Sequence, residues 1–208
     1  MSYLILIRHG LSEYNKLGIW TGWEDPELAP EGITEAIQAA ETIRDLPLDH
    51  GFTSTLKRHK ATLALVKQTL GNTSLPVTED QALTERNYGT YTGKNKWEVK
   101  KEIGDIEFQK LRRGWDYPIP EGESLRQVYE RVVEYYQRVI LPEILQGKNV
   151  IISSSGNALR SLVKYLEHIS DEDIASLEIA TGEVYVYSLN EKGDILSKEI
   201  RNQHPNTA

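Results

Sequence analysis

The chain has 208 residues and a mass of 23.7 kDa, a length that fits one compact domain with a sizeable core. Apolar residues make up 39% and charged residues 26% of the sequence, a balance that excludes both a membrane-spanning protein and an intrinsically disordered one. The net charge of −7 disfavours a general surface for nucleic acid or anionic membranes, so any anion must bind where basic side chains gather in one pocket.

The apolar pattern predicts strands and helices that alternate along the chain. In chain order these are a strand at 4–7, a helix at 31–44, a strand at 51–54, a helix at 56–70, a helix at 124–145, a strand at 149–153, a helix at 158–166 and a terminal hairpin of 184–189 and 195–200. The helix at 31–44 is expected to bury Ile33, Ala36, Ile37, Ala40 and Ile43. The predicted fold is therefore α/β, a three-layer sandwich whose mostly parallel central sheet carries helices on both faces.

Polar side chains follow three of the predicted strands. They are Arg8, His9 and Gly10 after the first, Thr53 and Ser54 at the end of the second, and Ser154, Ser155 and Gly156 after the third. Ligands of such sheets bind outside the carboxyl ends of the strands, so the three segments are expected to meet in one crevice.

Residues 81–123 differ from the rest of the chain because their apolar pattern is weak and turn residues are frequent. We expect an irregular lid or binding insertion here, inside a single domain that spans residues 1–208.

His9 by itself fits a hydrogen-bonded structural side chain as well as a ligand. With Arg8 before it and Ser12 and Asn15 after it, the segment offers the guanidinium, hydroxyl and amide groups that bind a phosphoryl group. Further candidates are Arg58, Lys96, Arg112 and Arg113, each either a solvated charge or part of a basic pocket, and Glu85, either an acid/base group or the ion-pair partner of Arg86. His50, His168 and His204 lack such neighbours and are expected to be structural or surface residues.

The order of these segments resembles a known family. Residues 8–15 read Arg-His-Gly-Leu-Ser-Glu-Tyr-Asn and resemble the RHGxSxxN signature of the histidine phosphatase superfamily. Residues 20–25, Trp-Thr-Gly-Trp-Glu-Asp, resemble the FTGWxD segment of cofactor-dependent phosphoglycerate mutases. Further matches at 52–58, 83–89, 93–96, 112–113, 123–125 and 156–160 extend over nearly the whole chain, which is similar to the short form of these mutases.

The resemblance implies an isomerase of glycolysis and gluconeogenesis that interconverts 2- and 3-phosphoglycerate. His9 would carry a phosphohistidine primed by the cofactor 2,3-bisphosphoglycerate, Arg8 and Arg58 would hold the phosphoryl group, and Glu85 would be the general acid/base. The substrate would be bound by Ser12, Asn15, Thr21, Gly22, Arg58, Glu85, Tyr88, Lys96, Arg112, Arg113, Gly156 and Asn157. No metal is implied, because arginine and backbone donors neutralise the charge.

The resemblance also bears on partners and location. The implied partners are small phosphorylated metabolites, with neither nucleic acid nor membrane, and a homo-oligomer is one of the assemblies that the family forms. Cysteine is absent, so a disulfide framework and a thiolate metal site are not expected. The first residues lack a signal-peptide pattern, and we expect a cytoplasmic protein.

One catalytic position departs from the family pattern. Ser155 stands where the family has a second histidine, a side chain that stabilises the phosphoryl group during transfer. Losing such a group costs about 10²–10³ in rate, so we expect low activity that Ser155→His restores by at least about tenfold. His59 stands where the family usually has alanine. Neighbours in a helix point about 100° apart, so we do not expect His59, next to Arg58, to replace the lost imidazole.

Two other functions stay open at this point. A phosphatase of the same fold would hydrolyse the phosphohistidine instead of returning the phosphoryl group. A pseudoenzyme, suggested by Ser155, would bind phosphorylated metabolites without phosphorylating His9.

Overall fold

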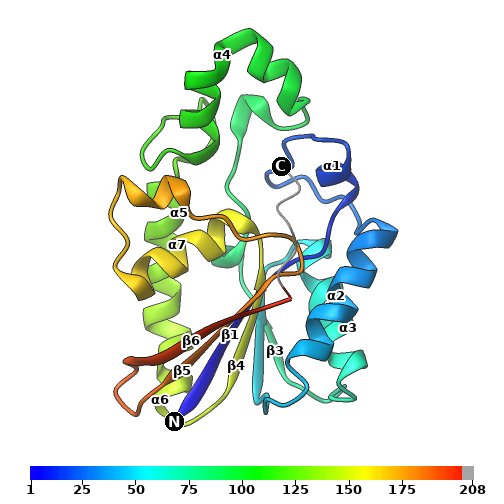
Figure 1. The fold of residues 1–208 in the computed structure, drawn as a ribbon, viewed down its shortest axis with the longest axis vertical. Helices are drawn as coiled ribbons and strands as arrows, with labels where there is room; N and C mark the ends of the chain where they lie inside the picture. Colours follow the sequence, from blue (N-terminus) through cyan, green and yellow to red (C-terminus); the bar gives the residue numbers. More distant parts are fainter. Residues whose placement is uncertain (203–208) are drawn as a thin grey trace.

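Six strands form one central sheet in the computed structural model, which describes residues 1–202 (Figure 1). His204, expected to be structural or at the surface, lies outside the described residues. The strand order is β3-β2-β4-β1-β5-β6. The strands are β1 Ser2–Arg8, β2 His50–Thr53, β3 Val77–Glu79, β4 Val150–Ser154, β5 Val184–Leu189 and β6 Ile195–Arg201. β1 to β4 run parallel to one another, β5 runs antiparallel to β1, and β6 runs antiparallel to β5. The predicted mostly parallel sheet is confirmed.

Helices cover both faces of the sheet, as predicted. They are α1 Glu13–Lys16, α2 Pro30–Thr42, α3 Lys57–Thr69, α4 Lys96–Arg113, α5 Leu125–Tyr135, α6 Leu141–Leu145 and α7 Gly156–Glu167. A π-helical turn at Tyr136–Ile140 joins α5 to α6, so the long helix expected at 124–145 is nearly continuous. Single turns of 3₁₀ helix lie at Gln81–Leu83, Gly89–Tyr91 and Asp173–Ser176.

The alternation of side chains along β1 divides the core into two layers. Leu4 and Leu6 pack on one face with residues of α5 and α7, whereas Ile5 and Ile7 pack on the other with residues of α2 and α3. All four side chains are almost fully buried. A strand with both faces covered needs apolar residues at every position, which explains why residues 4–7 form an unbroken apolar run.

The register of the parallel strands brings their carboxyl ends together. Arg8 pairs with Ser154 across β1 and β4, and Thr53 pairs with Ser153 across β2 and β4. The residues that follow these positions therefore start at one edge of the sheet. This confirms the expectation that the three polar segments meet.

Two features of the fold differ from the sequence prediction. Residues 81–123 are not irregular throughout, because Lys96–Arg113 form the 18-residue helix α4, which stands beyond the carboxyl ends of the strands in Figure 1. On α2, Ile33 and Ile37 are exposed, and Ala36, Ala39 and Ala40 form the buried face.

Candidate active site

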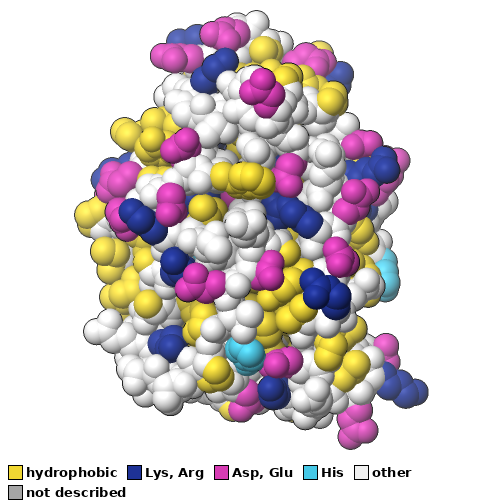
Figure 2. Space-filling model, turned by 180° about the vertical axis from the view of Figure 1, so that it is seen from behind, with side chains coloured by type: hydrophobic (Ala, Val, Ile, Leu, Met, Phe, Trp, Pro, Cys, Tyr) yellow, Lys and Arg dark blue, Asp and Glu magenta, His cyan; other side chains and the backbone are white. Residues whose placement is uncertain are grey.

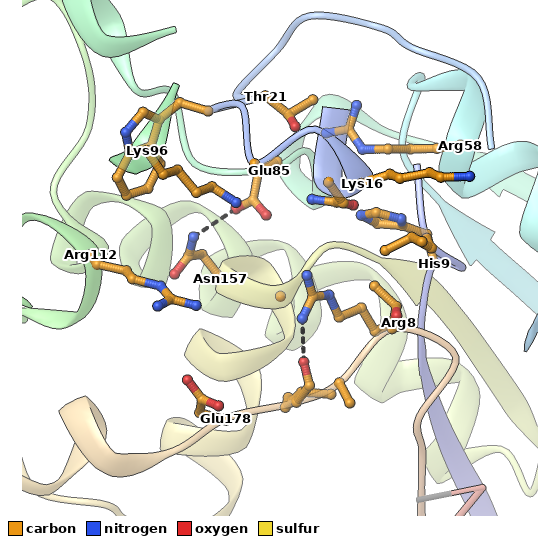
Figure 3. Close-up of a pocket in the computed structure, with 18 of the residues that line it drawn as sticks. Arg8, His9, Lys16, Thr21, Arg58, Glu85, Lys96, Arg112, Asn157 and Glu178 are labelled. Atoms are coloured by element: carbon orange, nitrogen blue, oxygen red, sulfur yellow. Dashed lines mark hydrogen bonds between the residues drawn. The ribbon is translucent and has the colours of Figure 1, made fainter. Parts of the chain in front are cut away.

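A cavity of about 530 Å³ opens at the carboxyl ends of β1, β2 and β4. Figure 3 shows side chains from β1, α3, α4 and α7 pointing toward its centre. Thirteen of the residues named from the sequence line it: Arg8, His9, Asn15, Thr21, Gly22, Arg58, Glu85, Tyr88, Lys96, Arg112, Arg113, Gly156 and Asn157. The structure thus brings the predicted basic residues into one hollow.

His9 lies at the end of β1 with its ring fixed by its own neighbour. Nδ1 donates a hydrogen bond of 2.7 Å to the carbonyl oxygen of Gly10, so in the neutral ring the lone pair is on Nε2. Burial, followed by the charges of Arg58 and Arg8, holds the pKa of His9 well below its usual value. His9 is therefore a neutral imidazole at physiological pH, and its Nε2 lone pair is available to an electrophile.

Gly10 allows the chain to turn away directly after His9. A Cβ atom at this position would lie 2.0 Å from the carbonyl oxygen of Gly32 in α2. The backbone of the histidine segment therefore packs against α2 at a distance that only glycine permits.

Arg8 and Arg58 stand on either side of His9 (Figure 3). Arg58 donates to the carbonyl oxygens of Glu24 and Gly22 at 2.8 and 3.0 Å, and burial lowers its pKa to about 10. Arg8 donates through one terminal nitrogen to the carbonyl oxygen of Ile179, whereas its buried Nε has no partner among the described residues. Two guanidinium groups are thus fixed beside the imidazole of His9 with donor capacity left over.

Glu85 is held by the first turn of α7. The side-chain amide of Asn157 donates to Glu85 Oε1 at 3.0 Å and to the Tyr88 hydroxyl at 2.8 Å, and Arg160 in turn donates to Asn157 Oδ1 at 2.8 Å. The alternative ion pair with Arg86 is not formed, because the Arg86 guanidinium donates to backbone carbonyl oxygens. Glu85 therefore keeps a carboxylate oxygen available to the cavity.

The far side of the cavity is basic. Burial, followed by the charges of Arg8 and Arg112, lowers the pKa of Lys96 to about 8. Arg113 forms an ion pair with Glu178, so one of the expected phosphate ligands already has a carboxylate partner. Arg112 points into the centre of the cavity in Figure 3.

The lining concentrates positive charge in an acidic molecule. Seven basic side chains and four acidic ones line the cavity, although the chain carries a net charge of −7. On the outer face shown in Figure 2, acidic and basic side chains are intermingled. The condition set by the composition, basic residues gathered in one pocket, is met.

Two predicted residues do not line the cavity. Ser12 is the N-cap of α1, where its hydroxyl accepts from the backbone N–H of Asn15. Ser155 is fully buried at the start of α7, behind the cavity wall formed by Gly156.

Further lining residues were not predicted from the sequence, among them Lys16, Trp20, Glu35, Arg160 and Glu178. Trp20 and Arg160 lie inside the segments that carried the resemblance, which is the signal that could have found them.

His59 contradicts the expectation that it points away from the site. Its Nε2 lies 2.5 Å from Ser155 Oγ, and its ring stacks on that of His9 with the centroids 5.2 Å apart. The side chains of Arg58 and His59 do diverge from α3, but Arg58 extends into the cavity and His59 extends toward β4. Both residues thus reach the surroundings of His9.

Comparisons with known proteins agree with this arrangement. The sequence profile of the histidine phosphatase superfamily (branch 1) matches residues 4–200. A 2,3-bisphosphoglycerate-dependent phosphoglycerate mutase from Chelativorans sp. is 46% identical over 199 residues, which cover 95% of this chain and 97% of the relative. The structure of YhfR from Bacillus stearothermophilus covers 99% of this chain and 98% of its own, with a TM-score of 0.84 and 22% identity. The α-ribazole phosphatase from Shigella flexneri covers 91% of this chain and 92% of its own, with a TM-score of 0.77 and 26% identity.

Proposed function

We propose, from the premise that this chain belongs to the histidine phosphatase superfamily, that it interconverts 2- and 3-phosphoglycerate through a phosphohistidine at His9. The observation that carries the proposal is a neutral, hydrogen-bonded imidazole between two buried guanidinium groups, with the Glu85 carboxylate lining the same cavity. The relative from Chelativorans, named as a mutase of this kind, supports the choice of substrate.

The proposed reaction uses His9 and Glu85 in sequence. The Nε2–phosphorus bond of phosphorylated His9 breaks as the substrate hydroxyl attacks phosphorus, and Glu85 takes the hydroxyl proton. In the return step His9 accepts the phosphoryl group from the other carbon's phosphoester, and Glu85 gives the proton back to the alkoxide oxygen. Arg8 and Arg58 hold the phosphoryl oxygens, and their fixed charges stabilise the charge that spreads over these oxygens in the transition state.

The donor groups of the cavity fit a ligand that carries several anionic groups, such as two phosphates and a carboxylate. Among the residues that line the cavity, Arg8 Nε and Thr21 Oγ1 are buried donors with no partner among residues 1–202. On the other side, Lys96 and Arg112 suit a second phosphate or a carboxylate. When bound, 2,3-bisphosphoglycerate would supply the first phosphoryl group to His9, and these residues would hold it.

The expected location, metal independence and oligomeric state of the protein belong to this proposal. None of the helices in the described part of the chain is long and apolar enough to cross a membrane. A cytoplasmic location, catalysis without a metal and a homo-oligomeric state stay predictions from the sequence.

Phosphatase activity is the second candidate. It is favoured by the likeness to a solved structure titled an α-ribazole phosphatase. The two functions differ in what happens to phosphorylated His9, because a phosphatase admits water to it and a mutase excludes water.

The deciding experiment follows both products from 3-phosphoglycerate in the presence of 2,3-bisphosphoglycerate. We expect 2-phosphoglycerate to form much faster than free phosphate, and both activities to disappear in His9→Asn. Release of phosphate without isomer exchange would assign the chain to the phosphatases, and loss of neither activity in His9→Asn would overturn both candidates.

A further inference from the structure

We propose that His59, hydrogen-bonded to Ser155 and stacked on His9, is a positioning residue that supplies the second imidazole of this site from α3. The inference rests on the proposed role of His9 as the phosphoryl acceptor. His59 is not among the residues that line the cavity.

The side chains of Ser54, His59 and Ser155 form one chain of hydrogen bonds. His59 lies in the first turn of α3, its Nδ1 is 2.6 Å from Ser54 Oγ after β2, and its Nε2 is 2.5 Å from Ser155 Oγ after β4. All three residues have no solvent exposure. The ring planes of His59 and His9 differ by 25°. His59 therefore supports the face of the nucleophile's ring, and both of its own nitrogens are fixed.

The hydroxyl of Ser155 bonds to His59 instead of capping the N-terminus of α7. Ser155 is the N-cap of α7, yet its side chain makes no capping bond. The N-cap serines of α1 and α5, Ser12 and Ser124, both accept from their helices. A serine at this position favours capping, so the bond to His59 outweighs it. Local helix formation does not explain the orientation of Ser155, whereas a fixed His59 does.

The imidazole of His59 works here as a neutral group. Burial, followed by the positive charge of Arg58, holds its pKa well below the usual value. Ser54 Oγ accepts from the backbone N–H of Leu56 at 3.1 Å, so its own proton is available to Nδ1. With the ring proton on Nε2, that N–H donates to Ser155, which keeps its hydroxyl proton. With these proton positions, both hydrogen bonds are donated in the direction from Ser54 toward Ser155. The positive ends of their dipoles then point toward an anion bound at His9, so such an anion favours this arrangement.

The geometry also couples positions 59 and 155. A distance of 2.5 Å between Ser155 Oγ and His59 Nε2 leaves no room for a ring at position 155 while His59 is present. The space next to His9 holds one imidazole, from α3 or from the start of α7. The earlier expectation for Ser155→His is therefore revised: the single substitution should lose activity, and it should gain only when His59 is made small.

The test is a cycle of four proteins: wild type, His59→Ala, Ser155→His and the double variant. The readouts are the dissociation constant of orthovanadate, a mimic of the transferring phosphoryl group, and the rate of His9 phosphorylation by 2,3-bisphosphoglycerate. We expect each single variant to weaken orthovanadate binding and slow phosphorylation by about tenfold or more. The double variant should return to within about threefold of wild type, a strongly non-additive result.

Two further variants separate the hydrogen bonds from packing. His59→Phe keeps a ring against His9 and loses both bonds, whereas His59→Gln offers an amide nitrogen near the position of Nε2. We expect His59→Gln to retain more orthovanadate affinity than His59→Phe at equal thermal stability. His168→Asn, on the exposed end of α7 and in a left-handed conformation that asparagine tolerates, is the matched control and should behave as wild type.

Each outcome decides between the two claims. Additive effects at positions 59 and 155, or unchanged affinity in His59→Ala and His59→Phe, overturn the role of His59. Wild type that binds orthovanadate but is not labelled by 2,3-bisphosphoglycerate overturns the proposed substrate, and the binding cycle then judges His59 alone. Wild type that binds no orthovanadate overturns both.

Discussion

The side chains of His9 and Glu85 are both held by hydrogen bonds in the free protein. The backbone of Gly10 sets the tautomer of His9, and the Asn157 amide sets the position of Glu85. Groups held in this way need little reorganisation during the reaction, which is how preorganised sites stabilise transition states. The proposed reaction therefore depends on the hydrogen bonds to His9 and Glu85 as much as on the two side chains themselves.

Replacing Glu85 separates proton transfer from phosphoryl binding. Glu85→Gln keeps an oxygen for the Asn157 amide but cannot take a proton, so we expect isomerisation to fall by about 10²–10⁴. Coupled assays of 2-phosphoglycerate formation measure this. Glu130→Gln, at an exposed position of α5, is the control. A Glu85→Gln rate within a factor of about three of wild type would remove Glu85 from the role of general base.

The pKa of Lys96 predicts a pH dependence. In the free protein this pKa is lowered to about 8, so the cation is present below that pH and lost above it. Because the substrate is anionic, kcat/KM for 3-phosphoglycerate should fall as the pH rises through about 8. Lys96→Arg keeps its charge, so the fall should move to higher pH, and Lys101→Arg on the same helix should leave it in place. An identical profile in Lys96→Arg would assign the fall to another group.

At the scale of the element, α4 and the segments beside it form their own small core. Trp20, Tyr88, Val99, Phe108 and Leu111 are buried together there, apart from the two core layers of the sheet. The helix bends at Gly104, whose φ of +80° is rare for residues with a side chain. A separate core of this kind allows α4 and the segments beside it to cover the cavity as one unit.

Weakening this small core should let water reach His9. Phe108→Ala removes a buried ring that lies near Trp20, at a cost of about 3–5 kcal/mol in the stability of that core. We expect the ratio of phosphate release to isomerisation to rise. Ile106→Ala is matched on the same helix, where Ile106 is 73% exposed, and should not change the ratio. If both variants keep the wild-type ratio, α4 does not exclude water from the site.

Strands and helices of the sheet could be predicted because their apolar residues follow the period of each element. α4 could not, since its buried residues Val99, Phe108 and Leu111 are widely and unevenly spaced and Gly104 interrupts the pattern. β3 was missed because only three residues, of which none is buried, form it. His9, Arg58 and Glu85 were found through motifs, whereas the place of His59 depends on contacts between α3 and β4 that no local pattern contains.

At the scale of the whole molecule, the acidic surface and the basic cavity act on the same ligand in opposite ways. The net charge of −7 repels phosphorylated metabolites at long range, and the buried arginines attract them at short range. Arg8 and Arg58 are already desolvated in the free protein. An anion that binds them therefore offsets the cost of burying their charges.

Ligand binding should therefore stabilise the fold strongly. At a 2,3-bisphosphoglycerate concentration of 100 Kd the expected gain is about 2.7 kcal/mol, which for a chain of this size raises Tm by roughly 5–11 °C. Differential scanning fluorimetry measures the shift, and Arg8→Gln should reduce it by at least about half. A shift of the same size in Arg8→Gln would place the ligand elsewhere on the molecule.

The formation of phosphohistidine at His9 can be observed by mass spectrometry after brief exposure to 2,3-bisphosphoglycerate. We expect one added phosphoryl group on His9 in wild type, lost on chase with 3-phosphoglycerate, and none at this position in His9→Asn. An unlabelled His9 in protein that binds the compound tightly, or a label on another residue, would contradict it.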